Sequence, residues 1–193
     1  MKMQVMALGA YQTNCYILWQ HDAEECIVID PGYCPEQILG AVKRLGLKIA
    51  AILLTHGHFD HVGGVKYLMD QTACRVYIHE AELSLPPEIT AGPLHYTDLY
   101  GTTLEEAGIR MKVLSTPGHT PGSVCLQTED ILITGDTLFA GSCGRTDFPG
   151  GSWTQICSSL KKLAALPGDY QVHPGHGGAS TLQQEREYNP YMQ

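Results

Sequence analysis

The stretch LLTHGHFDHVGG, residues 53–64, places three histidines and one aspartate within six positions, directly after an apolar run. That run, AAILL, is typical of a buried strand, so we expect His56 and His58 to lie on a tight loop where the strand ends. A helix should then begin near Asp60 or His61. A turning backbone aims the side chains of HxHxDH at two separate points, whereas the two histidines of HExxH share one face of a helix. The stretch therefore predicts two metal ions bound at a helix N-terminus.

Three later segments repeat the order of strand, small residue and metal-binding side chain. VLSTPGH ends in His119, ILITGD ends in Asp136 and VHPGH ends in His176. Because their glycines allow the backbone to approach closely, we expect these side chains to converge with the first group at one edge of the fold. Five histidines and two aspartates are too rich in nitrogen for calcium or magnesium. The set predicts two divalent ions, with zinc expected and iron or manganese as alternatives.

Four other histidines fall outside this pattern, and so does Asp30, an aspartate that also follows a strand-like run. A single histidine beside a strand end is usually a satisfied core or surface residue, and we interpret His21, His79 and His173 in this way. His95 lies in a long irregular segment, and its role stays open. Asp30, in VIDPG, follows an apolar strand as an ordinary turn residue does. It is therefore either structural or a support behind the metal ligands.

Strand-like and helix-like runs alternate along the chain. The strand-like runs include MQVMAL, CYILW, CIVID, RVYIH, IRMKVL, VCLQT and YQVHP, and several are apolar throughout, as in strands buried on both faces. Helices are predicted over PEQILGAVKRLG, HVGGVKYLMDQ, TLQQEREY and SWTQICSSLKKLAAL, the last with Ser152 as N-cap. This order predicts an α+β fold, a four-layer αββα sandwich. The irregular segment from Ser84 to Gly101 reads either as a functional rim or as a surface insertion.

Length, charge and cysteine content narrow the class of protein. A chain of 193 residues suits a single domain over residues 1–193, and no segment approaches the roughly 18 consecutive apolar residues of a membrane span. A net charge of −8 without a cluster of Lys and Arg disfavours nucleic acid and favours a small-molecule substrate. Seven scattered cysteines without CxxC indicate reduced thiols, and the first residues do not resemble a secretory signal. We therefore expect a cytoplasmic protein, of an oligomeric state that the sequence does not predict.

The segments THGHFDH, TPGHTPGS, TGDTLFAGSCGRTDF and HPGH resemble the metallo-β-lactamase superfamily, and within it the short bacterial proteins similar to hydroxyacylglutathione hydrolase (glyoxalase II). The similarity runs from QTNCYIL to EREYNPY, which is nearly the whole chain. It implies an αββα fold with a dinuclear metal site at one edge. It also implies the ligands, which are His56, His58 and His119 at the first metal, Asp60, His61 and His176 at the second, and Asp136 as the bridge.

Two features differ from full-length glyoxalase II. That family has a C-terminal helical domain that helps to bind glutathione, whereas this chain stops about 17 residues after His176, so we expect no such domain and a more open site. An aromatic residue two positions after the last histidine ligand is replaced by Gly178. Arg145, in SCGRTDF, matches a basic position that is associated with glutathione there, which implies substrate binding; the alternative is a pair with Asp147. The neighbouring Cys143 is interpreted as structural.

The expected chemistry is hydrolysis of a thioester. Metal coordination lowers the pKa of water from about 15.7 to near 7, so the nucleophile is expected to be a hydroxide that bridges the two ions. Asp60 and Asp136 are the catalytic carboxylates in this scheme, because they hold the ions in place. A thiolate with a pKa of about 8.5 leaves without being protonated, whereas an amine does not. The chemistry therefore favours a thioester over an amide, and the resemblance implies a small-molecule thioester such as S-lactoylglutathione.

Two other functions stay open. Persulfide dioxygenases resemble this chain in the HxHxDH block and in GRTDF while using one iron, so a mono-iron glutathione persulfide dioxygenase is the main alternative. A metal-binding module without turnover is the second. The flavodiiron branch is disfavoured because it would carry glutamate in place of His58. Secreted β-lactamases are disfavoured because they normally carry a signal peptide.

Overall fold

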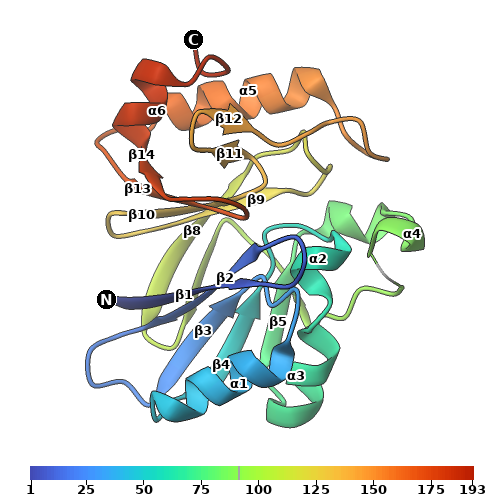
Figure 1. Cartoon of the computed structure of the whole chain (residues 1–193), viewed down its shortest axis with the longest axis vertical. Coiled ribbons are helices and arrows are strands. Elements are labelled where there is room, and N and C mark those ends of the chain that lie inside the picture. The colour runs from blue at the N-terminus through green and yellow to red at the C-terminus, as the bar shows by residue number, and fades with distance from the viewer. Residues whose placement is uncertain (91) are drawn as a thin grey trace.

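The first sheet comes from the N-terminal half of the chain. The computed structural model describes residues 1–90 and 92–193. The sheet has six strands in the order of the sequence, and β1 to β3 are antiparallel whereas β3 to β6 are parallel (Figure 1). The strands are β1 (Lys2–Leu8), β2 (Thr13–Trp19), β3 (Glu25–Ile29), β4 (Lys48–Leu53), β5 (Arg75–Ile78) and β6 (Asp98–Leu99).

The second sheet comes from the C-terminal half and has the order β14-β13-β10-β9-β8-β7. Its neighbours are antiparallel except β10 and β13, which are parallel. Since β8, β10 and β13 run in one direction, their carboxyl ends lie at the same edge of the sheet. The strands are β7 (Thr103–Glu106), β8 (Ile109–Ser115), β9 (Val124–Thr128), β10 (Ile131–Gly135), β13 (Gln171–Pro174) and β14 (Ser180–Thr181).

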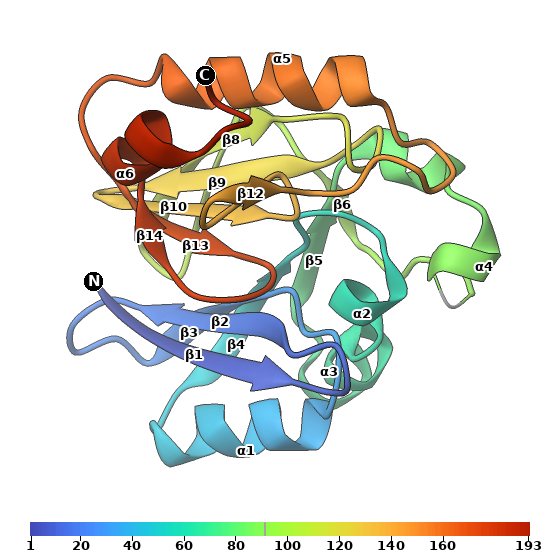
Figure 2. The same ribbon diagram turned by 45° about the horizontal axis from the view of Figure 1, so that its top comes forward.

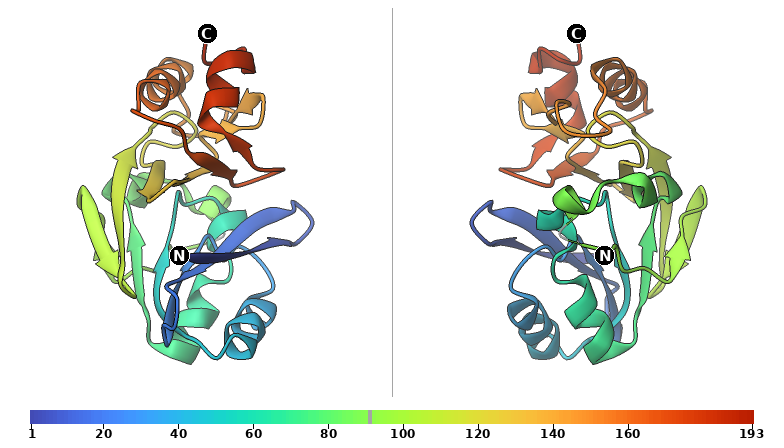
Figure 3. Two further views of the ribbon diagram at one scale, coloured as in Figure 1. Left: turned by 90° about the vertical axis from the view of Figure 1, so that its left-hand side faces the viewer. Right: turned by 90° about the vertical axis from the view of Figure 1, so that its right-hand side faces the viewer.

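Helices cover the outer face of each sheet (Figure 2). α1 (Pro35–Arg44) and α3 (Val65–Thr72) lie against the first sheet, and α5 (Trp153–Ala164) and α6 (Leu182–Tyr188) lie against the second, as Figure 3 shows from the side. The layers are therefore helix, sheet, sheet, helix. The predicted αββα sandwich is confirmed.

Three apolar clusters fill the spaces between these layers, and their members alternate along the strands. Ile27 and Ile29 of β3 face the second sheet, whereas Val28 between them faces α1 and α3. This alternation follows from the two-residue period of a strand. Because β3 is buried on both faces, its sequence reads as an unbroken apolar run. A third cluster, which includes Leu132 and Leu160, joins the second sheet to α5.

The helix expected over HVGGVKYLMDQ is wrong in one respect, because the structure breaks it in two. α2 (Phe59–Val62) ends before Gly63, and α3 begins after Gly64. The Gly64 amide donates to the carbonyl of Pro31 at 2.7 Å, and a Cβ at Gly64 would lie only 2.5 Å from that oxygen. The helix is therefore interrupted at the two glycines, where the loop after β3 packs against the backbone between α2 and α3.

The other helices follow the sequence closely. α1 and α5 occupy the predicted stretches, and the Ser152 side chain caps α5 by accepting from the amide of Gln155 at 3.4 Å. Thr181 caps α6 in a capping box with Gln184. Among its described residues, the expected irregular segment from Ser84 to Gly101 contains the end of a 3₁₀ helix (Glu80–Ser84), α4 (Pro87–Thr90) and the short β6. Within the described part of the chain, no helix has the length and apolar character needed to cross a membrane.

Candidate metal centre

All seven predicted metal-binding side chains lie at one edge of the sandwich, where strands of both sheets end. His56 and His58 follow β4, and Asp60 and His61 lie in α2, whose four residues start immediately after His58. From the second sheet, His119 follows β8, Asp136 follows β10 and His176 follows β13. The convergence expected from the repeated order of strand, small residue and polar side chain is therefore present.

Polar contacts hold the two sheets together beside this edge. The Asn14 amide on β2 donates to the carbonyl of Gly175 at 2.8 Å, and the Asn14 side chain donates to the carbonyls of Pro174 at 2.9 Å and Gly177 at 2.9 Å. Tyr16, also on β2, donates its hydroxyl to Pro174 at 2.5 Å. These bonds fix the end of β13, and with it His176, against the first sheet.

The first cluster consists of three buried histidines, His56, His58 and His119, whose ring nitrogens lie within 4.8 Å of one another. His119 Nε2 lies 2.9 Å from His58 Nδ1. His56 Nε2 is buried and has no hydrogen-bond partner among the described residues. A buried ring nitrogen without a partner is costly unless something binds it, and three convergent imidazoles are a common zinc ligand set.

The second cluster consists of Asp60, His61 and His176, again with donor atoms within 4.8 Å. His176 Nε2 lies 3.2 Å from Asp60 Oδ2 and 3.4 Å from His61 Nε2. Thr13 donates its hydroxyl to the same Asp60 oxygen at 3.1 Å, so the carboxylate is held toward the histidines. These contacts bring one carboxylate and two imidazoles to a second point, as the HxHxDH segment predicts.

Asp136 lies between the two clusters. Its Oδ2 is 3.5 Å from His119 Nε2 of the first cluster and 3.6 Å from His176 Nε2 of the second. Its Oδ1 is 3.4 Å from His61 Nε2 and, like His56 Nε2, is buried with no hydrogen-bond partner in the described chain. This position is the one that a bridging carboxylate requires.

The pattern of the metallo-beta-lactamase superfamily matches residues 8–176 of this sequence, a range that includes all seven side chains. The chain belongs to the metallo-beta-lactamase superfamily. It is 32% identical to the hydroxyacylglutathione hydrolase GloC of Haemophilus influenzae over 209 residues, which cover 100% of this chain and 98% of that protein.

Two solved structures are similar over the full length. The BLEG-1 B3 metallo-beta-lactamase is 36% identical with a TM-score of 0.89, and 99% of each chain is covered. TTHA1623, solved in a di-iron-bound form, is 36% identical with a TM-score of 0.87, over 97% of this chain and 99% of that one. Proteins that are 32% to 36% identical to this chain therefore include one named as a hydroxyacylglutathione hydrolase, one named as a β-lactamase and one solved with two irons bound.

Partners behind the histidines fix which nitrogen of each ring faces the centre. His61 Nδ1 donates to Asp30 Oδ2 at 2.9 Å, which leaves its Nε2 toward the aspartates. His119 Nδ1 donates to the carbonyl of Arg145 at 2.7 Å, and His176 Nδ1 donates to that of Tyr11 at 3.0 Å. Such outer partners orient metal-binding imidazoles and raise their basicity.

The sequence leaves two roles for Asp30, a structural turn residue or a support behind the metal ligands. In the structure it makes contacts that support the centre. It accepts from the Thr55 amide at 2.8 Å and the Thr55 hydroxyl at 2.6 Å, in addition to His61. The Thr55 oxygen in turn lies 3.1 Å from His56 Nδ1. Asp30 therefore holds one histidine of each cluster, the first through Thr55. A turn-like sequence gives no signal of this role, because the partners are 25 and 31 residues away.

The protonation states of the first histidine cluster and of Asp60 suit metal binding. Burial and the neighbouring His119 and His61 lower the pKa of His58 to about 4, so its ring is neutral near pH 7. Burial and His61 lower the pKa of His56 well below its usual value. Burial opposes ionisation of Asp60, yet His176 and His61 lower its pKa overall. Neutral imidazoles and ionised carboxylates are the forms that coordinate divalent cations. In the second cluster burial lowers the pKa of His61, but Asp136 and Asp30 raise it overall to about 9, so a cation bound there would displace a proton.

The donor set therefore fits two divalent ions. His56, His58 and His119 would hold the first, Asp60, His61 and His176 the second, and Asp136 would bridge them. Imidazole nitrogen with carboxylate oxygen is compatible with zinc and with iron, and the unpartnered His56 Nε2 and Asp136 Oδ1 are the atoms that most clearly call for a cation. The fold, the family and this centre are those of a metal-dependent hydrolase.

A cavity of 520 Å³ opens above the two clusters. Its floor includes Asp60 and Asp136, and aromatic rings line much of its wall, namely Tyr11, Phe59, Phe139 and Phe148. Cys143 also lines it, but burial raises the pKa of this thiol, which does not favour a nucleophilic thiolate and agrees with its predicted structural role. The cavity offers room for a small molecule directly over the metal-binding groups.

Arg145 lines the same cavity and pairs with Asp147, which is the alternative to substrate binding that the sequence left open. Its Nε and terminal nitrogen each donate to Asp147, both at 2.6 Å. Its guanidinium carbon also lies 4.0 Å from the centre of the Phe148 ring. The pair with Asp147 holds the cation at the rim of the cavity, where a bound substrate could reach it.

The remaining histidines lie outside the centre. His21 pairs with Asp22 at 2.7 Å on the surface, and the ring of His173 packs edge-on against Tyr16. His79 caps a 3₁₀ helix, Glu80–Ser84, by accepting from the Ala81 amide at 3.2 Å. His95 is half-buried and belongs to none of the metal-binding clusters found among residues 1–90 and 92–193.

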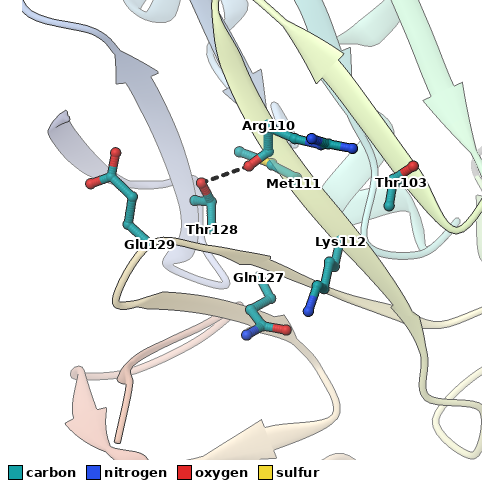
Figure 4. A pocket seen from close by; sticks show the side chains of 7 residues that line it. All are labelled: Thr103, Arg110, Met111, Lys112, Gln127, Thr128 and Glu129. Carbon is teal, nitrogen blue, oxygen red and sulfur yellow. Dashed lines mark hydrogen bonds between the residues drawn. The ribbon is translucent and has the colours of Figure 1, made fainter. Parts of the chain in front are cut away.

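A second cavity, of 340 Å³, lies against β7, β8 and β9 (Figure 4). Its lining residues differ from those of the cavity over the histidine clusters. Its side chains include Arg110 and Lys112 from β8 and Gln127 from β9, and the Thr128 hydroxyl donates to the Arg110 carbonyl at 2.9 Å. Neither histidines nor aspartates are among its lining residues. Glu129 is the one carboxylate among its lining residues, so this cavity lacks the cluster of ligands that the strand-end site provides.

We expect Asp136→Ala to lose most of the bound metal and nearly all activity, because the bridging carboxylate would serve both ions and its loss leaves two cations in mutual repulsion. Asp60→Ala should retain metal in the first cluster. Elemental analysis of the dialysed variants, with circular dichroism to confirm folding, measures both effects. Full metal occupancy in the Asp136 variant would contradict its assignment as the bridge.

Gly175→Ala should disturb the centre although it replaces no ligand residue. A Cβ at this position would lie 2.2 Å from Asp136 Oδ1 and 2.7 Å from a carbon of the His61 ring. We expect lower metal content and at least about a tenfold loss of kcat/KM, as for other changes that displace outer supports of a metal site. Gly178→Ala is the matched control, because a Cβ there meets nothing within 4 Å. Equal behaviour of the two variants would show that the Asp136 carboxylate has room to move.

Proposed function

We propose that this protein hydrolyses small-molecule thioesters, with 2-hydroxyacyl glutathione thioesters such as S-lactoylglutathione as the substrate class. The observation that carries the proposal is the position of Asp136 between two histidine clusters on the floor of an open cavity. The full-length similarity to the hydroxyacylglutathione hydrolase GloC supports it. A cytoplasmic location and zinc as the native metal are parts of the same proposal.

The residues of the chain prepare this reaction in three ways. His56, His58 and His119 are neutral donors at one point, and Asp60, His61 and His176 converge at the other. Divalent ions bound there would lower the pKa of water to about 7 and polarise a carbonyl oxygen. Asp60 and Asp136 set the charge and separation of the two points. The wall of the cavity places the substrate carbonyl over them.

The leaving group favours a thioester over an amide. A thiolate with a pKa of about 8.5 departs without a proton, whereas an amine must be protonated as it leaves. The aromatic rings of Tyr11, Phe59 and Phe148 offer apolar surface for the carbon chain of an acyl or thiol group. Arg145, at the rim, offers a cation to a carboxylate of the substrate.

A second candidate is hydrolysis of a β-lactam, which the similarity to the BLEG-1 B3 metallo-beta-lactamase favours. The same two metal points would serve for this ring opening, and the two reactions differ in the leaving group. A direct comparison of both substrates on one preparation distinguishes the candidates.

We expect protein of measured metal content to hydrolyse S-lactoylglutathione in the absence of oxygen, with kcat/KM well above that for a chromogenic cephalosporin. Oxygen uptake with glutathione persulfide should be negligible. A chelator should abolish the hydrolysis, and added zinc or iron should restore it. If one iron per chain supports fast persulfide-dependent oxygen uptake while thioester hydrolysis stays near background, the chain is a dioxygenase and the proposal is wrong.

Arg145→Ala should raise KM for carboxylated thioesters by about tenfold and leave neutral thioesters nearly unchanged. The reason is that its guanidinium lies at the rim of the cavity and meets an anionic part of the substrate. Asp147→Asn is the control, because it breaks the same ion pair but keeps the cation. It should leave KM unchanged or lower it. Equal increases in KM for both variants and both substrate types would point to a purely structural ion pair.

A further inference from the structure

We propose that Glu82 is a positioning residue that ties together the two loops carrying the histidines of the first metal point. Glu82 lies in the 3₁₀ helix, and its side chain is completely buried, with 0% exposed. One carboxylate oxygen, Oε2, accepts from the Gly57 amide at 2.5 Å. The other, Oε1, accepts from the Gly122 amide at 2.6 Å. One carboxylate thus joins two segments that are 65 positions apart in the sequence.

The two amides belong to the segments that position all three histidines of the first cluster. Gly57 is the residue between His56 and His58, and Gly122 follows His119 by three positions in the same loop between β8 and β9. The distance between the loops decides whether His119 Nε2 and His58 Nδ1 can meet, as they do at 2.9 Å. Glu82 touches neither ring, so it acts on them through the backbone.

Both glycines are shaped to receive this carboxylate. A Cβ at Gly122 would lie 2.8 Å from Glu82 Oε1 and 2.8 Å from its Cγ. A Cβ at Gly57 would lie 3.1 Å from Oε2. A side chain at Gly122 would thus push the carboxylate away, and one at Gly57 would crowd it. The glycines in THGH and TPGS are therefore explained by the approach of Glu82 as well as by the turns themselves.

Burying a carboxylate costs free energy, because an ionised group loses its hydration when it is removed from water. Burial raises the pKa of Glu82, while Thr120 and the amides of Gly57 and Gly122 act against that rise. An apolar side chain could pack between the loops, but it would leave two buried amides without acceptors. Only a group with two acceptor atoms in one plane satisfies both loops at once.

The discriminating variant is Glu82→Gln, which keeps the size and shape of the side chain. An amide has one acceptor oxygen and one donor nitrogen, so it can serve one loop while its NH₂ group faces the N–H of the other. Glu185→Gln is the matched control. Glu185 is also buried and accepts from a glycine amide, Gly141 at 2.9 Å. That glycine lies in the turn between β11 (Leu138–Phe139) and β12 (Ser142–Cys143), which is neither of the two loops that Glu82 joins.

The test measures metal affinity and geometry on the full chain, and therefore does not depend on the substrate. We expect the Kd of the first cobalt ion, measured in competition with a chelator, to rise about 10- to 100-fold in Glu82→Gln. The visible absorption of the bound cobalt should also change, because the histidines are no longer held at the same spacing. Glu185→Gln should lose thermal stability but keep the Kd and the spectrum of the unaltered protein.

Unchanged cobalt affinity and spectrum in a folded Glu82→Gln protein would overturn the proposal and leave Glu82 as a structural residue. If that variant does not fold, Gly122→Ala tests the same bond from the other side, because its Cβ displaces Oε1. It should raise the Kd in the same way, and a wild-type Kd would again overturn the proposal. Absence of thioester hydrolysis by the unaltered protein with its metal bound would instead argue against the proposed substrate, and the cobalt measurements on Glu82→Gln would still decide the role of Glu82.

Discussion

The hydrogen bonds of the buried Asp30 carboxylate are the interaction on which the geometry of the metal-binding side chains depends most. The carboxylate accepts from the Thr55 amide, the Thr55 hydroxyl and His61 Nδ1, all within 2.9 Å. A carboxylate with three donors is stable in a dry interior, and these donors fix the course of the chain between β4 and α2. The Asp30 amide also donates to the Leu53 carbonyl at 3.1 Å, so that the ends of β3 and β4 are joined at the point where the histidine segment begins.

The two sheets supply different halves of the centre, and their relative position is therefore a chemical requirement. The first sheet contributes HxHxDH, and the second contributes His119, Asp136 and His176. β2 links them, because Asn14 and Tyr16 bind the carbonyl of Pro174 from one strand of the first sheet. The hairpin between β1 and β2 completes the link, since the Tyr11 carbonyl accepts from His176. The apolar core brings the sheets face to face, and these few polar bonds set their register at the edge.

Most of the centre could be predicted from the sequence, because its ligands obey a local rule. Each ligand-bearing segment follows a strand and has a small residue directly before a ligand, and strands that run in one direction end at one edge. Asp30 and Glu82 could not be assigned, because their roles rest on partners 25 to 40 residues away that no local pattern encodes. The prediction of one continuous helix over HVGGVKYLMDQ is wrong for a related reason. Apolar spacing favours a continuous helix, but Gly64 packs against Pro31, a tertiary contact that outweighs local preference.

Under the proposed function, Arg145 at the rim of the cavity has a structural contact with Asp147 and also a role in substrate binding. Arg145 is more than half exposed and so is Asp147, so water screens their attraction and the pair adds little to stability. A substrate carboxylate that is held over the metal-binding floor can therefore replace Asp147 at modest cost. Phe148 keeps the guanidinium in place from the other side through a cation–π contact. The ion pair thus positions the cation at the rim, and the same weakness that limits its structural value would leave the cation available to the anionic thioester that we propose as substrate.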